Sequence, residues 1–282
     1  MSMTTIGIDI GGTKLLILAG ERSARLPTGP SATSAQIEAA IREQLVAWGI
    51  TRPAAIGIAI PGLVDRSGRV QISGVLPALK GWHPGEALSA DFGCPVLALN
   101  DAEAALVEEA QDLAPDATVA LVMAGTAIGA AFRVDGRPLR GASGWAGELG
   151  FFPQRVGAGP GEYKRLDELA GGRHIAATLG IDGARLAELA QAGDPKALAA
   201  IAAGGEALGL ALAGVVNLFN PHRLVLGGGT LELPGYEAAA LAALKTTTLP
   251  PMLAACELRR SEAGPEVVAR GAIRAVESMG KT

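Results

Sequence analysis

The residues of this chain that are best suited to chemistry follow an aliphatic stretch that reaches a carboxylate and then turns on two glycines. Asp9 is followed by Gly11 and Gly12, and a hydroxyl and an amine come next, at Thr13 and Lys14. Glycine lets backbone N–H groups approach an anion closely. The sequence therefore predicts a phosphate-binding turn, with Asp9 available for a Mg²⁺ ion bound through the phosphate. The alternative is an ordinary hairpin with a polar tip.

The stretches on either side of this turn indicate which elements position it. Both are short, aliphatic and bounded by glycine, which favours two strands joined as a hairpin. Residues 7–14 look superficially like the nucleotide loop G-x-x-x-x-G-K-[ST], but Thr13 stands where the lysine belongs, and a strand follows instead of a helix. The dinucleotide fingerprint G-x-G-x-x-G is absent here. The turn instead resembles the first phosphate hairpin of the actin, hexokinase and Hsp70 ATPase fold.

A second carboxylate stands at the boundary between a buried strand and a helix. Asn100 and Asp101 follow the expected strand over residues 95–99. In an open α/β sheet this edge is where ligands bind, and a carboxylate there can accept the proton of an attacking hydroxyl. The alternative reading is that the pair only caps the helix.

Three further segments are candidates for binding. Gly125-Thr126 forms a second glycine hairpin that could close on phosphates, and Gly227-Gly228-Gly229 would let the backbone approach an adenine or a ribose. Glu148, in a loop of small residues, could hold sugar hydroxyls through charge-assisted hydrogen bonds. Each has a plain alternative: a common hairpin, a flexible connection and a solvent-exposed acid.

The order of elements predicts the fold class. Strands are expected over 23–27, 54–60, 95–99, 119–123, 127–134, 223–226 and 257–259, and helices over 34–48, 84–90, 195–218 and 265–279. Strands and helices alternate in two sets, each opening with a hairpin, and a domain junction is expected at residues 114–116. This indicates two α/β lobes with a cleft between them.

Bulk properties exclude several classes of function. The 282 residues carry a net charge of −4, which argues against a nucleic-acid partner. Two distant cysteines, Cys94 and Cys256, make no disulfide framework or zinc cluster and favour a reduced, cytoplasmic setting. We expect no membrane partner, because no signal peptide is evident and no uninterrupted apolar run reaches the roughly 20 residues that span a bilayer.

Taken together, the motifs resemble the ROK family of sugar kinases and related repressors over essentially the whole chain. The matching segments are residues 9–14, 61–65, 100–101, 125–129, 140–150 and 217–229. The resemblance implies the two-lobed actin-like ATPase (ribonuclease H-like) fold, with residues 1–113 and a C-terminal helix over 265–282 in one lobe and 114–264 in the other. It also implies MgATP as the phosphoryl donor and a homodimer.

The resemblance also implies a role for each candidate residue. Asp101 would be the general base, and the three glycine segments, with Asp9, Thr13 and Lys14, would hold the nucleotide and its Mg²⁺. The residues implied in sugar binding are Gly62, Asn100, Glu148 and Asp167.

The chain departs from the family pattern at several positions. Phe151 stands where the family has a histidine that serves the sugar and a structural zinc, and the cysteine cluster that should follow is missing. We therefore expect no zinc. Asp167 replaces a sugar-binding glutamate with a shorter carboxylate, and Ala127 replaces a glycine of the second hairpin.

The function expected from the sequence is ATP-dependent phosphorylation of a hydroxyl of a hexose or N-acetylhexosamine. The alternative is a catalytically silent sugar-binding or sensing protein of the same family. Family repressors carry an N-terminal DNA-binding segment, and we expect none here, because the phosphate hairpin already begins at Ile6.

Overall fold

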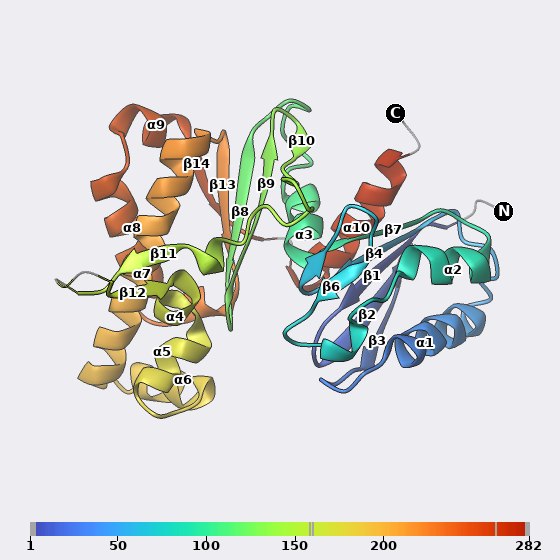
Figure 1. Ribbon diagram of the computed structural model, residues 1–282, viewed down its shortest axis with the longest axis horizontal. Helices are drawn as coiled ribbons and strands as arrows, with labels where there is room; N and C mark the ends of the chain where they lie inside the picture. Colours follow the sequence, from blue (N-terminus) through green and yellow to red (C-terminus); the bar gives the residue numbers. More distant parts are fainter. Residues whose placement is uncertain (1–3, 158, 160, 263, 280–282) are drawn as a thin grey trace. The chain divides into compact units, whose positions relative to one another are not determined.

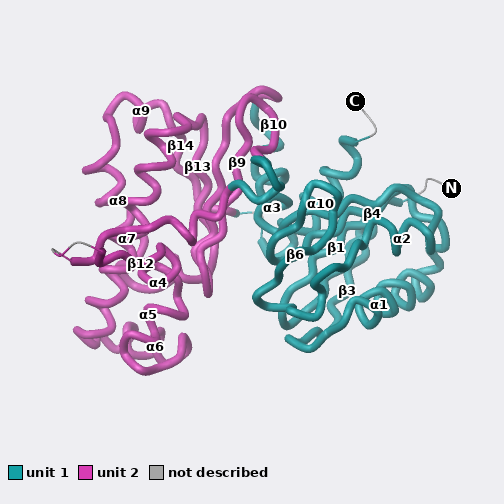
Figure 2. The backbone as a smooth tube through the Cα atoms, viewed as in Figure 1, with its two compact units in different colours: residues 1–113, 140–146, 262–282 teal, residues 114–139, 147–261 magenta. Residues whose placement is uncertain are grey.

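A computed structural model describes residues 4–157, 159, 161–262 and 264–279. The chain forms two compact units (Figure 2). Unit 1 comprises Met1–Leu113, Arg140–Ala146 and Glu262–Thr282, and unit 2 comprises Ala114–Leu139 and Gly147–Ser261.

This division differs from the expected boundaries at two places, because residues 140–146 and 262–264 group with unit 1. The first difference has a clear physical cause. Arg140 donates two hydrogen bonds, of 3.0 and 2.7 Å, to Glu103 Oε1, and Arg66 donates to the carbonyl of Gly141. These contacts join residues far apart in sequence. The expected C-terminal helix over 265–282 includes residues 280–282, which lie outside the described residues.

Unit 1 is built on a five-stranded sheet with the order β3-β2-β1-β4-β7 (Figure 1). Its strands are β1 (Ile6–Ile10), β2 (Lys14–Ala19), β3 (Arg22–Pro27), β4 (Ile56–Ile60) and β7 (Val96–Asn100), with the small pair β5 (Leu63–Val64) and β6 (Val70–Ile72). Its helices are α1 (Ser34–Ala47), α2 (Pro84–Phe92), α3 (Asp101–Glu109) and α10 (Val267–Ser278), with short 3₁₀ turns η1 (Pro77–Leu79) and η4 (Gly264–Glu266). Strand β2 pairs antiparallel with both β1 and β3. Strand β4 pairs parallel with both β1 and β7.

Helices cover both faces of this sheet. Successive side chains of a strand point to opposite faces, so one strand can contribute apolar side chains to both. Ile6, Ile8 and Ile10 of β1 share a buried cluster with side chains of α1 and α2. On the opposite face, Ala59 and Leu99 pack with residues of α3 and α10. The approach of α10 is close: a Cβ atom at Gly57 would lie 2.0 Å from the carbonyl oxygen of Ala272. The C-terminal helix is thus part of the core of unit 1.

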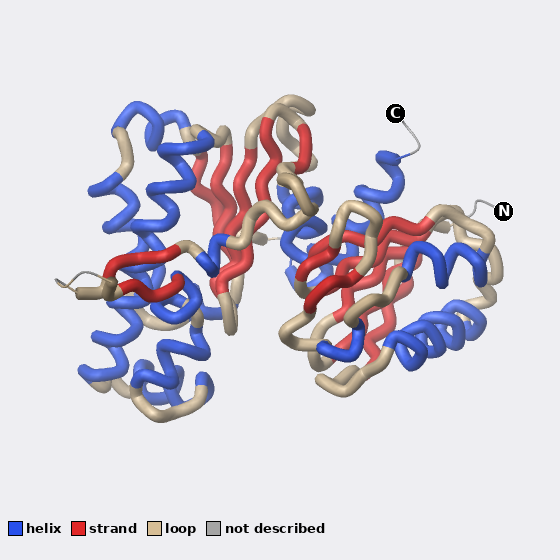
Figure 3. The backbone as a smooth tube through the Cα atoms, in the orientation of Figure 1, coloured by secondary structure: helices blue, strands red, loops and turns tan. Residues whose placement is uncertain are grey.

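Unit 2 contains a second five-stranded sheet, with the order β10-β9-β8-β13-β14. Its strands are β8 (Val119–Ala124), β9 (Ile128–Val134), β10 (Arg137–Pro138), β13 (Arg223–Gly227) and β14 (Glu257–Arg260), with a separate hairpin of β11 (Pro153–Arg155) and β12 (Tyr163–Arg165). Its helices are α4 (Leu166–Ala170), α5 (Gly172–Thr178), α6 (Gly183–Gln191), α7 (Pro195–Phe219), α8 (Tyr236–Thr247) and α9 (Pro250–Ala255), with 3₁₀ turns η2 (Leu149–Phe151) and η3 (Gly229–Glu232). As in unit 1, the sheet joins an antiparallel half to a parallel half, and both sheets are visible in Figure 3.

Helix α7 is the central helix of unit 2. Asp194 caps its start by accepting from the backbone N–H groups of Lys196 and Ala197, and the helix ends at Asn220, whose φ is 42°, just before Pro221. Gly205 and Gly209 let it lie directly on α8, since a Cβ atom at either would come within 2.2 Å of an α8 carbonyl oxygen.

Helix α7 bears on the expectation that no uninterrupted apolar run is long enough to cross a membrane: Glu206 interrupts its apolar residues, so that expectation is not contradicted. Among the described residues, α7 alone is long and apolar enough by length and composition. The most apolar window is 61% buried inside the protein, and its buried side chains belong to the core of unit 2.

Candidate active site

The carboxyl ends of three adjacent parallel strands bring the unit 1 candidates together. Asp9 pairs in register with Ala59 of β4, and Ala59 pairs with Leu99 of β7, so Asp9 lies one position before the level of Asn100. Asp101 is the first residue of α3, directly after β7. The two carboxylates that the sequence singled out separately therefore share one edge of the sheet.

The first glycine turn is a tight hairpin, as the sequence predicts. The backbone N–H of Gly11 donates to the carbonyl of Lys14 at 2.8 Å, and the Thr28 hydroxyl donates to the carbonyl of Gly11 at 2.6 Å. The side chains of Thr13 and Lys14 are exposed. The turn is thus braced from behind by Thr28 while its hydroxyl and amine remain accessible to a ligand.

Asp9 and Asp101 influence each other electrostatically. The pKa of Asp9 is raised from 3.8 to about 6, mainly by burial and also by the charge of Asp101, while Lys14 opposes the shift. Burial also raises the pKa of Asp101, against a hydrogen bond from the backbone N–H of Ala102. Two carboxylates near one another in a low-dielectric setting attract either a proton or a cation.

Asn100 and Gly62 fix the local geometry beside Asp101. The Asn100 side chain is the N-cap of α3, accepting from Ala102 N at 2.8 Å, and its amide donates to the carbonyl of Gly62 at 2.9 Å. Gly62 has a φ of 116°, and a Cβ atom there would lie 2.2 Å from the carbonyl oxygen of Ile72. The capping alternative therefore holds for Asn100, whose amide also ties the turn after β4 to the start of α3.

In unit 2 the glycine segments converge at the ends of two neighbouring strands. Gly227 pairs with Met123, so the turns that follow β8 and β13 are adjacent. Thr230 donates from its hydroxyl to the carbonyl of Gly125 at 2.8 Å. Gly228 has a φ of 97°, and a Cβ atom there would lie 2.3 Å from the Ala124 carbonyl oxygen. Any side chain at this position would therefore be strained.

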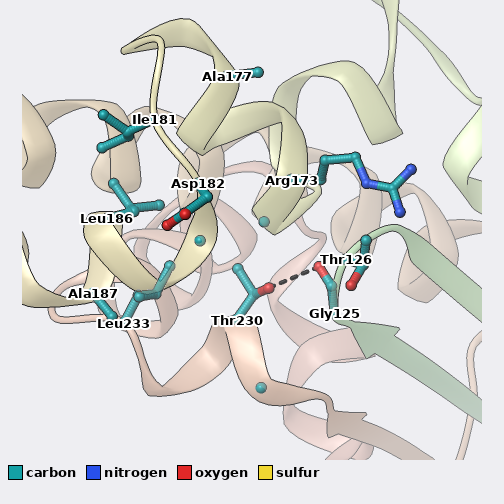
Figure 4. A pocket seen from close by; sticks show the side chains of 13 residues that line it. Gly125, Thr126, Arg173, Ala177, Ile181, Asp182, Leu186, Ala187, Thr230 and Leu233 are labelled. Atoms are coloured by element: carbon teal, nitrogen blue, oxygen red, sulfur yellow. Dashed lines mark hydrogen bonds between the residues drawn. The ribbon is translucent and has the colours of Figure 1, made fainter. Parts of the chain in front are cut away.

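A cavity of about 780 Å³ opens beside these turns (Figure 4). Gly125, Thr126 and Gly229 line it together with residues of α5, α6 and η3. At one end Figure 4 shows apolar side chains, among them Ile181 and Leu186, and at the other Thr126 and Arg173. A cavity with an apolar end and a polar end suits a ligand that has a flat ring and a charged tail.

The lining residues from α5 and α6 were missed in the sequence. Both helices are shorter than the 10–12 residues at which an apolar period becomes informative, and glycine interrupts the segment at Gly180 and Gly183. The only sequence signal in this region is the glycine pair at Gly171 and Gly172, whose backbone packs against the second hairpin through a hydrogen bond from Gly172 N to the Gly125 carbonyl (2.9 Å).

The two remaining candidates, Glu148 and Asp167, also lie in unit 2. Glu148 is exposed and immediately precedes the 3₁₀ turn η2. Asp167 accepts a hydrogen bond of 2.6 Å from the backbone N–H of Ile128, which follows the second hairpin. Its carboxylate therefore supports that hairpin from the side.

Phe151, the residue in place of the family histidine, is 57% exposed. The guanidinium carbon of Arg165 lies 4.9 Å from the centroid of its ring, and Arg165 also pairs with Glu168 at 3.2 Å. Among the residues that the structure describes, no group of three or more His, Cys, Asp or Glu side chains could hold a metal ion.

Comparisons with known proteins give a consistent result. The ROK family profile matches residues 5–278. The chain is 30% identical over 255 residues to the beta-glucoside kinase of Klebsiella pneumoniae, covering 83% of this chain and 84% of that protein. It is 31% identical over 252 residues to the N-acetylmannosamine kinase of Citrobacter koseri, covering 84% and 87%.

Among solved structures, the ROK hexokinase of Thermus thermophilus is similar with a TM-score of 0.81 and 31% identity, covering 99% of both chains. The expected α/β class and actin-like ATPase fold are therefore confirmed. With a family profile that spans nearly the whole chain and relatives at this level of identity, the protein belongs to the ROK family.

Proposed function

We propose that this protein is an ATP-dependent sugar kinase that phosphorylates a hydroxyl of a hexose or an N-acetylhexosamine. The observation that carries the proposal is the position of Asp101, at the carboxyl end of β7, on the same sheet edge as Asp9 and in the same unit as the phosphate hairpin. The similarity to a beta-glucoside kinase and to N-acetylmannosamine kinases supports a sugar as acceptor.

In this proposal Asp101 accepts the proton of the sugar hydroxyl as that oxygen attacks the γ-phosphorus. The raised pKa of Asp101 suits a general base, because basicity closer to neutral pH improves proton transfer. Phosphoryl transfer otherwise needs mainly positioning and charge neutralisation. Asn100, Gly62, Glu148 and Asp167 would hold the sugar.

The phosphates would be bound by the turn at Gly11, Gly12, Thr13 and Lys14 and by the turn at Gly125-Thr126, with the adenine near Gly227-Gly228-Gly229. Both turns connect antiparallel strands, β1 to β2 in unit 1 and β8 to β9 in unit 2. The apolar end of the unit 2 cavity supports the placement of the base.

Mg²⁺ fits the residues present on one ground: Asp9 and Asp101 form an acidic pair whose repulsion a cation would relieve. When bound, the ion would neutralise phosphate charge, and Asp9 would hold it through the phosphate or a water. We extend the proposal to a zinc-free, cytoplasmic protein without nucleic-acid or membrane partners.

A homodimer is part of the same proposal. Phe151, Phe152 and Leu218 are exposed and line a mostly apolar hollow of about 330 Å³ in unit 2. Exposed apolar patches of this kind mark association surfaces. Sedimentation of the purified protein tests this point.

The decisive experiment is phosphorylation of a panel of hexoses and N-acetylhexosamines with MgATP, in parallel for the protein and for Asp101→Asn. We expect turnover of at least one sugar by the unchanged protein and none by Asp101→Asn, while sugar and ATP still bind. Full activity of Asp101→Asn would remove Asp101 as the base. Sugar binding without turnover by the unchanged protein would instead establish the catalytically silent sensor.

A further inference from the structure

Arg173 lies at the polar end of the unit 2 cavity and is not used by the function described above. It is the only basic residue among those that line the cavity in the described part of the chain. Its backbone N–H donates to the Thr126 carbonyl at 3.3 Å, which ties α5 to the second hairpin. Figure 4 shows its guanidinium extending beside Thr126 and away from Ile181 and Leu186.

The Arg173 side chain makes no hydrogen bond or ion pair with any residue that the structure describes, and it is exposed. Two other arginines of unit 2 behave differently: Arg165 pairs with Glu168, and Arg185 pairs with Glu188. A guanidinium without a protein partner, beside a glycine turn, has all its N–H donors available. Its planar fork matches the oxygens of a phosphate group.

We propose that Arg173 binds the phosphate chain of the nucleotide that occupies this cavity. The inference rests on the proposed kinase function and adds a residue to it: unit 2 would supply its own phosphate-binding cation, in addition to Lys14 of unit 1. The ring of the nucleotide would lie against Ile181 and Leu186, and its phosphates would extend toward Thr126 and Arg173.

The test compares the binding of adenosine, AMP, ADP and the non-hydrolysable ATP analogue AMPPNP by calorimetry. The variants are Arg173→Ala, Arg173→Lys and the matched control Arg185→Ala, whose guanidinium pairs with Glu188 at 2.8 Å and does not line the cavity. Loss of one charged hydrogen-bonding group corresponds to roughly a 10- to 100-fold change in affinity. We expect that loss in Arg173→Ala for ADP and AMPPNP, unchanged affinity for adenosine, partial rescue in Arg173→Lys, and no change in the control.

Each other outcome contradicts a distinct statement. If the unchanged protein binds ADP and Arg173→Ala binds it equally well, Arg173 does not contact the phosphates, and the kinase proposal is unaffected. If Arg173→Ala weakens adenosine and ADP by the same factor, Arg173 acts on the base or on the shape of the cavity, and the inference is wrong. If the unchanged protein binds none of the four ligands, the proposed ATP-dependent function itself fails. A thermal melt of each variant verifies that the fold is retained, which we expect because the Arg173 side chain has no described partner.

Discussion

Replacement of Asp9 by asparagine should make the protein more stable while impairing its activity. The pKa of Asp9 is raised from 3.8 to about 6 by burial and by the neighbouring Asp101. Because a tenfold change in an acid's ionisation equilibrium corresponds to about 1.4 kcal/mol, the rise of the pKa from 3.8 to about 6 corresponds to about 3 kcal/mol of unfolding free energy. The asparagine side chain keeps the shape of the aspartate but carries no charge.

The sign of the effect follows from the direction of the shift. Below pH 3.8 Asp9 is protonated in both states, and its ionisation costs nothing. As the pH rises from 3.8 toward 6, Asp9 ionises in the unfolded chain before it ionises in the folded protein. The free energy of unfolding therefore falls over this range, and the fall is complete once the pH has passed the folded-state pKa of about 6. We therefore expect Asp9→Asn to be more stable than the unchanged protein by up to about 3 kcal/mol at pH 8, with most of that gain gone near pH 4.

Urea unfolding followed by tryptophan fluorescence measures this directly, because Trp48, Trp82 and Trp145 all belong to unit 1, as does Asp9. Asp91→Asn is the control of opposite sign: Asp91 pairs with Arg42 at 2.5 Å near the surface, and its removal should cost about 0.2–1 kcal/mol. A gain for Asp9→Asn that is equal at pH 4 and pH 8, or no gain at pH 8, would refute the electrostatic reasoning.

Four further outcomes are expected. Gly228→Ala should lower the free energy of unfolding by about 1–3 kcal/mol in urea unfolding followed by circular dichroism, whereas Gly229→Ala, which has open space around its Cβ position, should change it little; equal effects would contradict the strain argument. Glu103→Gln should weaken the bond from Arg140, which holds the segment that precedes the proposed sugar ligand Glu148, and raise the sugar KM about 3- to 10-fold with kcat nearly unchanged; an unchanged KM would show that this ion pair does not position Glu148. The pH profile of kcat/KM should fall on the acid side with an apparent pKa above that of an ordinary aspartate, because burial raises the pKa of Asp101, and a profile flat down to pH 4 would argue against it as the base. Elemental analysis of the purified protein should find no zinc, and one zinc per chain would overturn the expectation drawn from Phe151 and the missing cysteines.

The local part of the fold was predictable from the sequence. Both hairpins, the strand that ends at Asn100 and the helix over 195–218 depend on short-range patterns of apolar residues, glycine and proline. The helix expected from residue 34 begins there, and its N-cap is Thr33, which forms a capping box with Gln36.

The parts that depend on distant contacts were not predictable. Nothing adjacent in sequence indicates that Arg140 pairs with Glu103 of α3, although residues 140–146 group with unit 1. Likewise, the cavity of unit 2 is lined by residues between Gly125 and Leu233 that only the packing of α5 and α6 brings together. The roles assigned to Asp101, Glu148 and Asp167 stay predictions until the variants are assayed.

The place of α10 in the core of unit 1 has a consequence for biosynthesis. The sheet that carries Asp9 and Asp101 is translated early, yet the face formed by Gly57, Ala59 and Leu99 is covered only in part, by α3, until residues 267–278 have left the ribosome. The residues of unit 2 are all synthesised before α10. A ribosome stalled before codon 267 would therefore display the part of that apolar face that α10 covers to chaperones.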